Sequence, residues 1–264
     1  MKNKKSKVFP APKNPPGNGY DGCKIIECNP GFESYFVFFN PFRVAVKGKE
    51  HLVKFNDSES YSMKNILSNT ETRSWEWFLT TSGINSYIEL ENVLSFYIWA
   101  NKYGTSVVNY KKFQKINNEN PCVIPPEEDL IDEEINKEFI KYLYEKGVRE
   151  VYNYSDDYQI KDIKIKDLCN ITDDFELTIP KSGWSGSTIT TLDKKLSIVG
   201  CNNSAFNLLM GEESIVAELI DTLNLEGFYC NNETAYGWGV LDISEEDLLL
   251  DDKESSNYKK VFNT

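Results

Sequence analysis

The sequence has very little histidine, and this scarcity limits the chemistry that the chain can perform. His51 is the single histidine among 264 residues. Zinc and iron sites built from several histidines are therefore excluded, and any Cys–His or Ser–His pair would have to use this one residue. The sequence also has neither a G-x-x-x-x-G-K-S/T loop nor a G-x-G-x-x-G turn that opens a helix after a strand. These absences disfavour the common kinds of nucleotide chemistry.

Long apolar runs are absent as well. No stretch approaches the roughly 18 apolar residues that cross a bilayer. The lysine-rich N-terminus is followed by "VFPAPKNPPGNG", where a signal peptide needs about 7 to 15 apolar residues. We therefore expect a cytoplasmic protein without a membrane partner. In that compartment we expect its cysteines to be reduced; they are Cys23, Cys28, Cys122, Cys169, Cys201 and Cys230.

Basic residues are outnumbered, with 29 lysines and arginines against 41 aspartates and glutamates and a formal net charge of −12. Such a balance disfavours nucleic acid and favours a basic protein partner. The segment "NYKKFQK", residues 109–115, is the one place where basic and aromatic residues interleave as in an RNA-binding surface. Lysines that surround buried aromatic rings explain it more simply, so we expect no nucleic acid partner.

The first half of the chain predicts an arm, a broken strand and two helices. Residues 1–34 are rich in Pro and Gly and predict an extended or partly disordered arm. The aromatic and β-branched run 35–46 predicts a buried strand that is interrupted at Pro41. Ser86 and Glu89 have the spacing of a capping box at the start of a helix. A second apolar stripe, residues 131–143, predicts a helix that ends at Lys146-Gly147.

The last 120 residues or so turn to extended patterns. Strands are predicted in "VREVYNY", "FELTIP", "STITTLD", "KLSIVG" and "SAFNLLM", followed by a short helix over 215–223 and a strand at "GFYC". The closely joined strands indicate an antiparallel meander. The predicted fold is α+β, with a helical middle segment packed with a mainly antiparallel C-terminal sheet. We expect one domain over 35–250, divisible into a mainly helical 35–147 and a sheet-rich 148–250, and a flexible tail over 251–264.

The segment "KSGWSGSTITTLD" differs by one residue from the G-x-S-x-G turn that presents a catalytic serine. Ser187 replaces the second glycine of that motif, and a strand rather than a helix is expected to follow. The lone His51 also precedes Ser185 in the chain, which reverses the order of the hydrolase triad, although order alone excludes nothing. We interpret the segment as a structural turn, in which Trp184 either fills the core or contacts a partner.

Aromatic residues are plentiful, with 5 Trp and 15 Tyr. Most are expected to fill the core, but Trp and Tyr also anchor protein interfaces and line ligand pockets. The contact or pocket residues that we predict are Trp184, Ser185, Tyr229, Tyr236 and Trp238. We predict no catalytic, cofactor-binding or metal-binding residue. The acidic run 127–134 lacks the alternating spacing and central glycine of an EF-hand, and is more typical of a solvated helix start.

Three segments carry a resemblance to a known family. They are "YFVFFNPF", "GINSYIELENVLSFYIWANKYG" and "LEGFYCNNETAYGW". With them the chain resembles an uncharacterised family of Bacillus-type bacterial cytosolic proteins, a domain of unknown function, over roughly residues 20 to 240. The resemblance implies one continuous domain and brings no activity with it. In the family a His-Pro-Phe often stands where this chain has Asn40-Pro41-Phe42.

Two functions from different classes follow. The first is a non-enzymatic interaction protein of the bacterial cytosol, in its most concrete form immunity or antitoxin-like, that binds a basic protein partner. The alternative is a small-molecule-binding protein or hydrolase-type enzyme with an aromatic-lined pocket. The sequence leaves open both the catalytic question and the oligomeric state, and it favours the first function because no catalytic constellation is present.

Overall fold

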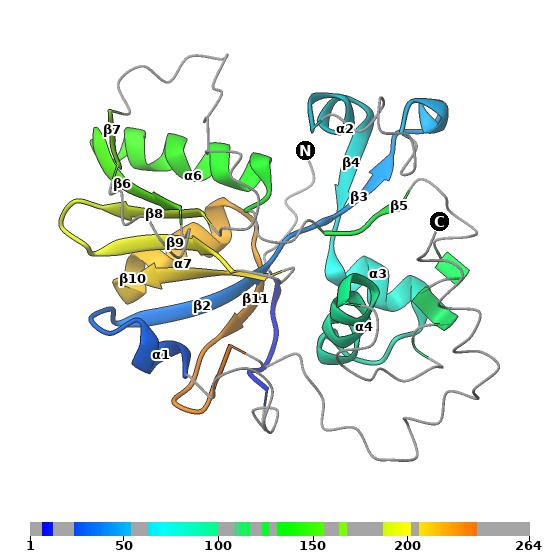
Figure 1. The fold of residues 1–264 in the computed structure, drawn as a ribbon, viewed down its shortest axis with the longest axis horizontal. Coiled ribbons are helices and arrows are strands. Elements are labelled where there is room, and N and C mark those ends of the chain that lie inside the picture. The colour runs from blue at the N-terminus through cyan, green and yellow to red at the C-terminus, as the bar shows by residue number, and fades with distance from the viewer. Residues whose placement is uncertain are drawn as a thin grey trace. The chain divides into compact units, whose positions relative to one another are not determined.

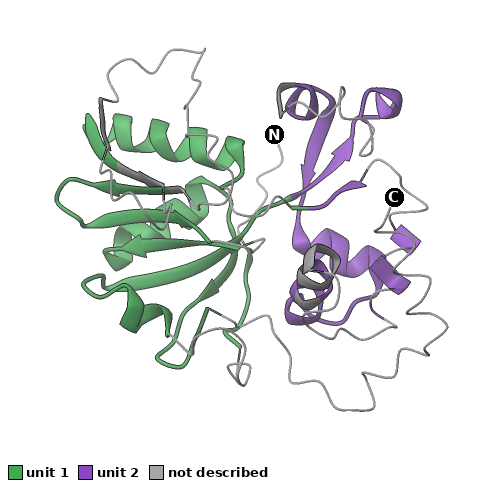
Figure 2. Ribbon diagram, in the orientation of Figure 1, with its two compact units in different colours: residues 1–13, 23–41, 126–236 green, residues 14–22, 42–125, 237–264 purple. Residues whose placement is uncertain are grey.

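The chain folds into two compact units in the computed structural model, which Figure 2 distinguishes by colour. Unit 1 comprises residues 1–13, 23–41 and 126–236; unit 2 comprises residues 14–22, 42–125 and 237–264. The structure describes residues 7–12, 24–53, 63–99, 109, 111–113, 115–116, 123–126, 131–155, 164–167, 187–201 and 206–236. The chain passes from unit 1 to unit 2 after Pro41 and returns at Pro126. The single domain expected over 35–250 stays a prediction.

Unit 1 contains a large, mainly antiparallel sheet, which confirms the α+β class and the sheet type (Figure 1). In the described part of the chain its strand order is β1-β11-β2-β10-β9-β8-β6-β7. Only the β1–β11 pair is parallel among these described pairs. The strands are β1 (Lys7–Val8), β2 (Ser34–Phe39), β6 (Glu150–Ser155), β7 (Lys164–Asp167), β8 (Ser187–Thr191), β9 (Leu196–Gly200), β10 (Phe206–Gly211) and β11 (Glu226–Tyr229). The meander β8–β9–β10 that the sequence predicts is confirmed.

Two amphipathic helices, α6 (Glu133–Glu145) and α7 (Glu213–Thr222), pack against this sheet, and the short helix α1 (Ile25–Cys28) precedes β2. Asp132 caps α6, because its side chain accepts hydrogen bonds from two backbone amides of the first turn. Gly147, with φ +85°, ends the helix in the left-handed conformation that the sequence predicts. The buried cluster of the two helices and the sheet includes Phe36, Phe38, Phe139, Leu143, Ile198, Leu209 and Leu219.

The strand predicted over 35–46 is broken where Pro41 was expected to break it. β2 lies in the sheet of unit 1, whereas β3 (Phe42–Ala45) lies in the smaller sheet of unit 2. All six residues of β2 are buried, which explains its continuous apolar pattern. Asn40, between the strands, is 1 % exposed. Its Oδ1 accepts hydrogen bonds from the Asp132 amide at 3.0 Å and from Asn207 Nδ2 at 2.8 Å.

Unit 2 combines helices with a small antiparallel sheet of order β4-β3-β5 among the described residues. Its elements are β3, η1 (Glu50–Leu52), α2 (Met63–Asn69), β4 (Thr70–Arg73), α3 (Trp75–Ser82), α4 (Tyr87–Trp99) and β5 (Val123–Ile124). The rings of Phe42 and Phe78 stack with centroids 4.2 Å apart. The predicted serine cap of α4 is confirmed, because Ser86 Oγ accepts from the Glu89 amide at 3.2 Å. The Glu89 carboxylate also reaches back, but it accepts from the amide of Asn85, the residue before the N-cap, at 3.2 Å.

One prediction made from the sequence is wrong, and others fall outside the described residues or stay untested. The expectation that all cysteines are reduced is wrong for Cys28, which is disulfide-bonded, while Cys201 and Cys230 are free. Sequence spacing does not give the distance between sulfur atoms, which decides whether a disulfide forms. The predicted strand "FELTIP" and the tail 251–264 lie outside the described residues, and the packing of the whole helical middle segment on the C-terminal sheet stays a prediction. No described helix is long and apolar enough to cross a membrane.

Candidate functional site

Several connections of unit 1 meet at one end of its sheet. The register places Gly211, at the end of β10, opposite Ser34 at the start of β2. It places Tyr229, at the end of β11, opposite Phe36 of β2. The turn between β8 and β9 lies at the same end, because Leu196 pairs with Gly211. We call this region, at the left of Figure 1, the Tyr229 end of the sheet.

Tyr229 is the predicted contact residue that the structure leaves accessible. Its side chain is 36 % exposed, although the residue belongs to a strand whose neighbours Gly227 and Phe228 are buried. The ring meets Phe36 edge to face, with centroids 5.1 Å apart and an angle of 70° between the planes. Edge-to-face packing holds one side of the ring in place. Tyr229 therefore presents a positioned aromatic surface rather than a freely rotating side chain.

Two carboxylates of α7 act on this ring electrostatically. Burial raises the pKa of Tyr229, and the negative charges of Glu213 and Asp221 on α7 raise it further, because both oppose formation of a tyrosinate. The Glu33 carboxylate accepts a hydrogen bond from the Glu213 amide at 3.4 Å, so it adds another negative charge at the start of α7. An aromatic face in a negative field attracts cationic side chains.

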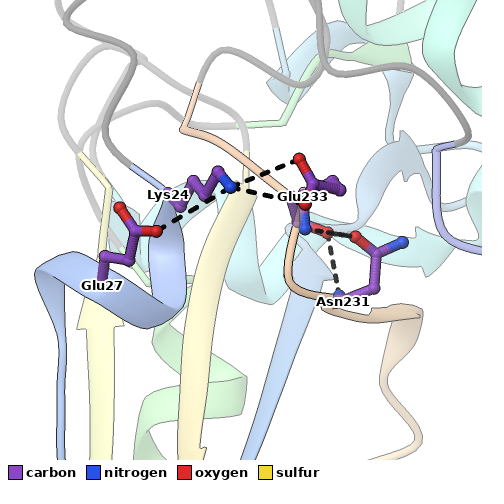
Figure 3. A network of polar contacts seen from close by, with 5 residues as sticks. Lys24, Glu27, Asn231 and Glu233 are labelled. Carbon is purple, nitrogen blue, oxygen red and sulfur yellow. Dashed lines mark hydrogen bonds and ion pairs between the residues drawn. The ribbon is translucent and has the colours of Figure 1, made fainter.

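A polar network fixes the turn that follows β11, residues 230–236 (Figure 3). Asn231 Oδ1 accepts a hydrogen bond from the Glu233 amide at 2.9 Å, which closes a local side-chain turn. Lys24 Nζ lies 3.3 Å from Glu233 Oε2 and 3.8 Å from Glu27 Oε1. These ion pairs are largely exposed and each contributes about 0–1 kcal/mol. The network therefore fixes the position of the turn more than it stabilises the fold.

Tyr236, a second predicted contact residue, is half-buried in this turn. Its hydroxyl accepts a hydrogen bond from Asn29 Nδ2 at 2.7 Å, and the same amide donates to the Ile25 carbonyl at 2.8 Å. The Tyr35 hydroxyl donates to the Asn29 carbonyl at 2.7 Å. Tyr236 thus ties the turn to the end of α1, and its hydroxyl is already engaged inside the protein.

Cys230, next to Tyr229, is a free thiol of low nucleophilic reactivity. Burial of its sulfur raises the pKa of Cys230 to about 12, because desolvation disfavours the thiolate. At pH 8 about one molecule in ten thousand carries the reactive thiolate. Such a cysteine is unsuited to nucleophilic catalysis, which needs a lowered pKa.

We expect Cys230 in the folded protein to react with iodoacetamide at pH 8 about a thousandfold more slowly than an unperturbed thiol. Peptide mass mapping after timed alkylation would measure this rate, and the urea-unfolded protein serves as the control that restores reactivity. Rapid modification of Cys230 while the protein remains folded would contradict the assigned burial.

The remaining predicted residues, Trp184, Ser185 and Trp238, lie outside the residues that the structure describes. His51 is exposed on η1 of unit 2. Within the described ranges, no group of three or more His, Cys, Asp or Glu side chains is placed to hold a metal ion. The residues that sequence reasoning missed are Phe36, Glu213 and Asp221. Only the β2–β11 register and the position of α7 bring them to Tyr229.

Comparison with known proteins places the chain in a family but gives it no function. No curated protein and no solved structure matches the chain. One family model covers residues 21–240, which span the three segments on which the sequence resemblance rests and most of the described part of both units. The Bacillus-type origin stays a prediction. The chain belongs to the family described as "Protein of unknown function (DUF2711)".

Proposed function

We propose that this protein is a non-enzymatic interaction protein that binds a basic protein segment at the Tyr229 end of its sheet. The observation that carries the proposal is the exposed, positioned Tyr229 ring, which the negative charges of Glu213 and Asp221 reach electrostatically. A lysine or arginine of the partner would lie over the ring and near the carboxylates at once. The net charge of −12 would speed the approach of such a partner.

The finer form of this proposal is a cytoplasmic bacterial protein of immunity or antitoxin type. An inhibitor of a basic toxin has to occupy a positively charged surface, and an acidic, aromatic-centred surface is complementary to one. The raised pKa of Cys230 supports a binding role over cysteine catalysis at this end of the sheet.

We expect Tyr229→Ala to weaken binding of the basic partner about thirtyfold, because a central interface tyrosine contributes about 2 kcal/mol. The partner is first sought by co-expression with basic products of neighbouring genes, and its dissociation constant is then measured by calorimetry. The matched control is Tyr144→Ala. Tyr144 is a 40 % exposed tyrosine on α6 whose ring lies 4.1 Å from the Arg149 guanidinium carbon.

The two variants separate a specific site from general charge attraction. Equal weakening by Tyr229→Ala and Tyr144→Ala, or none by either, would contradict the assignment of the site. Binding should also weaken as salt is added, since much of the attraction comes from exposed charges. If the protein is a folded monomer and retains no basic partner in any co-expression, the proposed function is wrong.

A further inference from the structure

The sheet of unit 1 is bordered at the β11 side by a very short strand. β1 has two residues, Lys7 and Val8, and pairs in parallel with Glu226 and Gly227 of β11. The Phe9 amide adds one hydrogen bond, to the Gly227 carbonyl at 2.7 Å. Val8 is 48 % exposed. The border strand is therefore only two residues long, and about half of the Val8 surface is exposed.

The strand that β1 covers extends further than β1 does. β11 runs to Tyr229, two residues beyond the last paired residue, Gly227. Backbone groups alternate in direction along a strand. The Cys230 amide points to β2, where it donates to the Tyr35 carbonyl, whereas the Gly227 carbonyl points outward to Phe9. Tyr229, two residues from Gly227, has its backbone amide and carbonyl on the same outer side.

The segment that occupies this edge has the composition expected of the proposed partner. Lys7 stands opposite Glu226, and its Nζ lies 5.3 Å from the centre of the Phe9 ring. The Phe9 ring packs at 5.9 Å from Phe39 of β2. Three further lysines, at positions 2, 4 and 5, precede Lys7 in the sequence. A basic, extended segment with an aromatic residue is thus already bound at an edge that leads to Tyr229.

We infer that the outer edge of β11, Glu226–Tyr229, is a strand-acceptor site for a lysine-rich extended segment of the partner, and that β1 occupies it as an exchangeable internal ligand. The inference rests on the proposed function, because its occupant is the basic segment proposed there. A strand added at this edge would gain main-chain hydrogen bonds along β11, and a basic side chain at the position of Lys7 would lie opposite Glu226.

Occupation by β1 also regulates how tightly the site binds the partner. A tethered segment has an effective concentration in the millimolar range, so a free peptide competes poorly with it. The apparent affinity for the partner is proportional to the fraction of molecules in which β1 has left the edge, so it is low while β1 is bound. A change that releases β1 should therefore raise the affinity for a basic strand without altering the acceptor site itself.

The test uses two proline variants of the whole chain. Phe9→Pro removes the amide that donates to Gly227 and the ring that packs on Phe39, so it should release β1. Val8→Pro is the matched control, because successive amides alternate and that of Val8 points away from β11. The probe is a fluorescent peptide with the sequence of residues 1–12, and its binding is followed by fluorescence anisotropy. A probe carrying the Phe9→Pro change controls for charge alone.

We expect the probe to bind the Phe9→Pro protein about tenfold or more tightly than the wild-type or Val8→Pro protein. A folded Phe9→Pro protein that binds the probe no more tightly than wild type would overturn the inference. Equal binding of the altered probe would overturn it as well, since charge alone would then suffice.

Hydrogen exchange of the wild-type protein gives a second measurement that does not depend on a variant folding. The Gly227 amide, on the β1 side, should exchange about a hundredfold faster than the Phe228 amide, on the β2 side. Equal protection would show that β1 does not leave the edge, and the inference would fail. The proposed function fails separately, when Tyr229→Ala leaves partner binding unchanged although the probe binds the opened edge.

Discussion

Gly227→Ala is expected to abolish stable folding of unit 1. A Cβ at this position would lie 1.8 Å from the Val37 carbonyl oxygen and 2.8 Å from the Phe38 Cα, both backbone atoms of β2. Backbone cannot move aside as the end of a flexible side chain can. β11 would have to separate from β2, with loss of their pairing and exposure of Phe228, which is 0 % exposed. We expect a loss of more than about 3 kcal/mol of unfolding free energy.

Gly211→Ala is the matched control, because it also adds one methyl group to a strand of the same sheet. Its Cβ would lie 3.0 Å from Leu196 Cδ1 and 3.0 Å from the Lys195 carbonyl oxygen. The overlap with the Lys195 carbonyl at 3.0 Å is far smaller than an overlap at 1.8 Å, and Leu196 can rotate away in part, so the expected cost is about 1 kcal/mol. Urea unfolding followed by circular dichroism measures both. A Gly227→Ala protein that unfolds at the wild-type urea concentration would contradict the close approach of β11 to β2.

Local features of the fold were predictable because they depend on neighbours in sequence. Ser86 and Glu89 form the predicted cap of α4, and the interruption of the long apolar strand occurs at Pro41. The β8–β9 turn forms at Asp193-Lys194, where the Lys194 φ of 58° is left-handed. Each of these follows from the hydrogen bonds or dihedral angles that a few adjacent residues can adopt.

The assignment of segments to sheets was not predictable, because it depends on pairing over long sequence separations. β2 and β3 are separated by Asn40 and Pro41 only, yet they belong to different sheets. β2 pairs with β10 across more than 160 residues, with Phe39 opposite Phe206. The parallel pairing of Lys7–Val8 with β11 has no periodic pattern, since two residues are too few to show one.

Of the residues at the candidate site, only the exposed Tyr229 could be named from the sequence. Aromatic abundance pointed to Tyr229, but nothing local distinguishes it from the buried Phe228 beside it. The carboxylates that give the site its charge come from α7, and their approach follows from how that helix packs on the sheet. An acidic composition predicts the sign of the partner's charge. It does not predict where on the surface the partner binds.

Asn40 lies in a buried network that joins three segments of unit 1. Its Oδ1 accepts hydrogen bonds from the Asp132 amide and from Asn207 Nδ2, and all three residues are buried. Asp132 in turn caps α6 through its own carboxylate. The amide of Asn40 therefore connects the end of β2, the start of α6 and β10 at the sheet end opposite Tyr229. These bonds give the position a structural role.

Asn40→Ala is expected to lower the unfolding free energy by about 2–5 kcal/mol. The change leaves two buried donors, the Asp132 amide and Asn207 Nδ2, without an acceptor, and each such loss costs about 1–3 kcal/mol. Asn40→His should fall between wild type and alanine, because one ring nitrogen accepts a single hydrogen bond. A histidine at this position, as the resemblance implies for related chains, would thus keep part of the network and need no catalytic role.

A double-mutant cycle with Asn207→Ala tests the network itself. Within the described residues, Asn207 Oδ1 has no hydrogen-bond partner, so removal of Asn207 loses only its bond to Asn40. We expect Asn207→Ala to cost less than Asn40→Ala, and the double variant to cost less than the sum of the two. Unfolding free energies from urea titration give the coupling. If the two losses of unfolding free energy simply add in the double variant, Asn40 and Asn207 do not interact, and the network is contradicted.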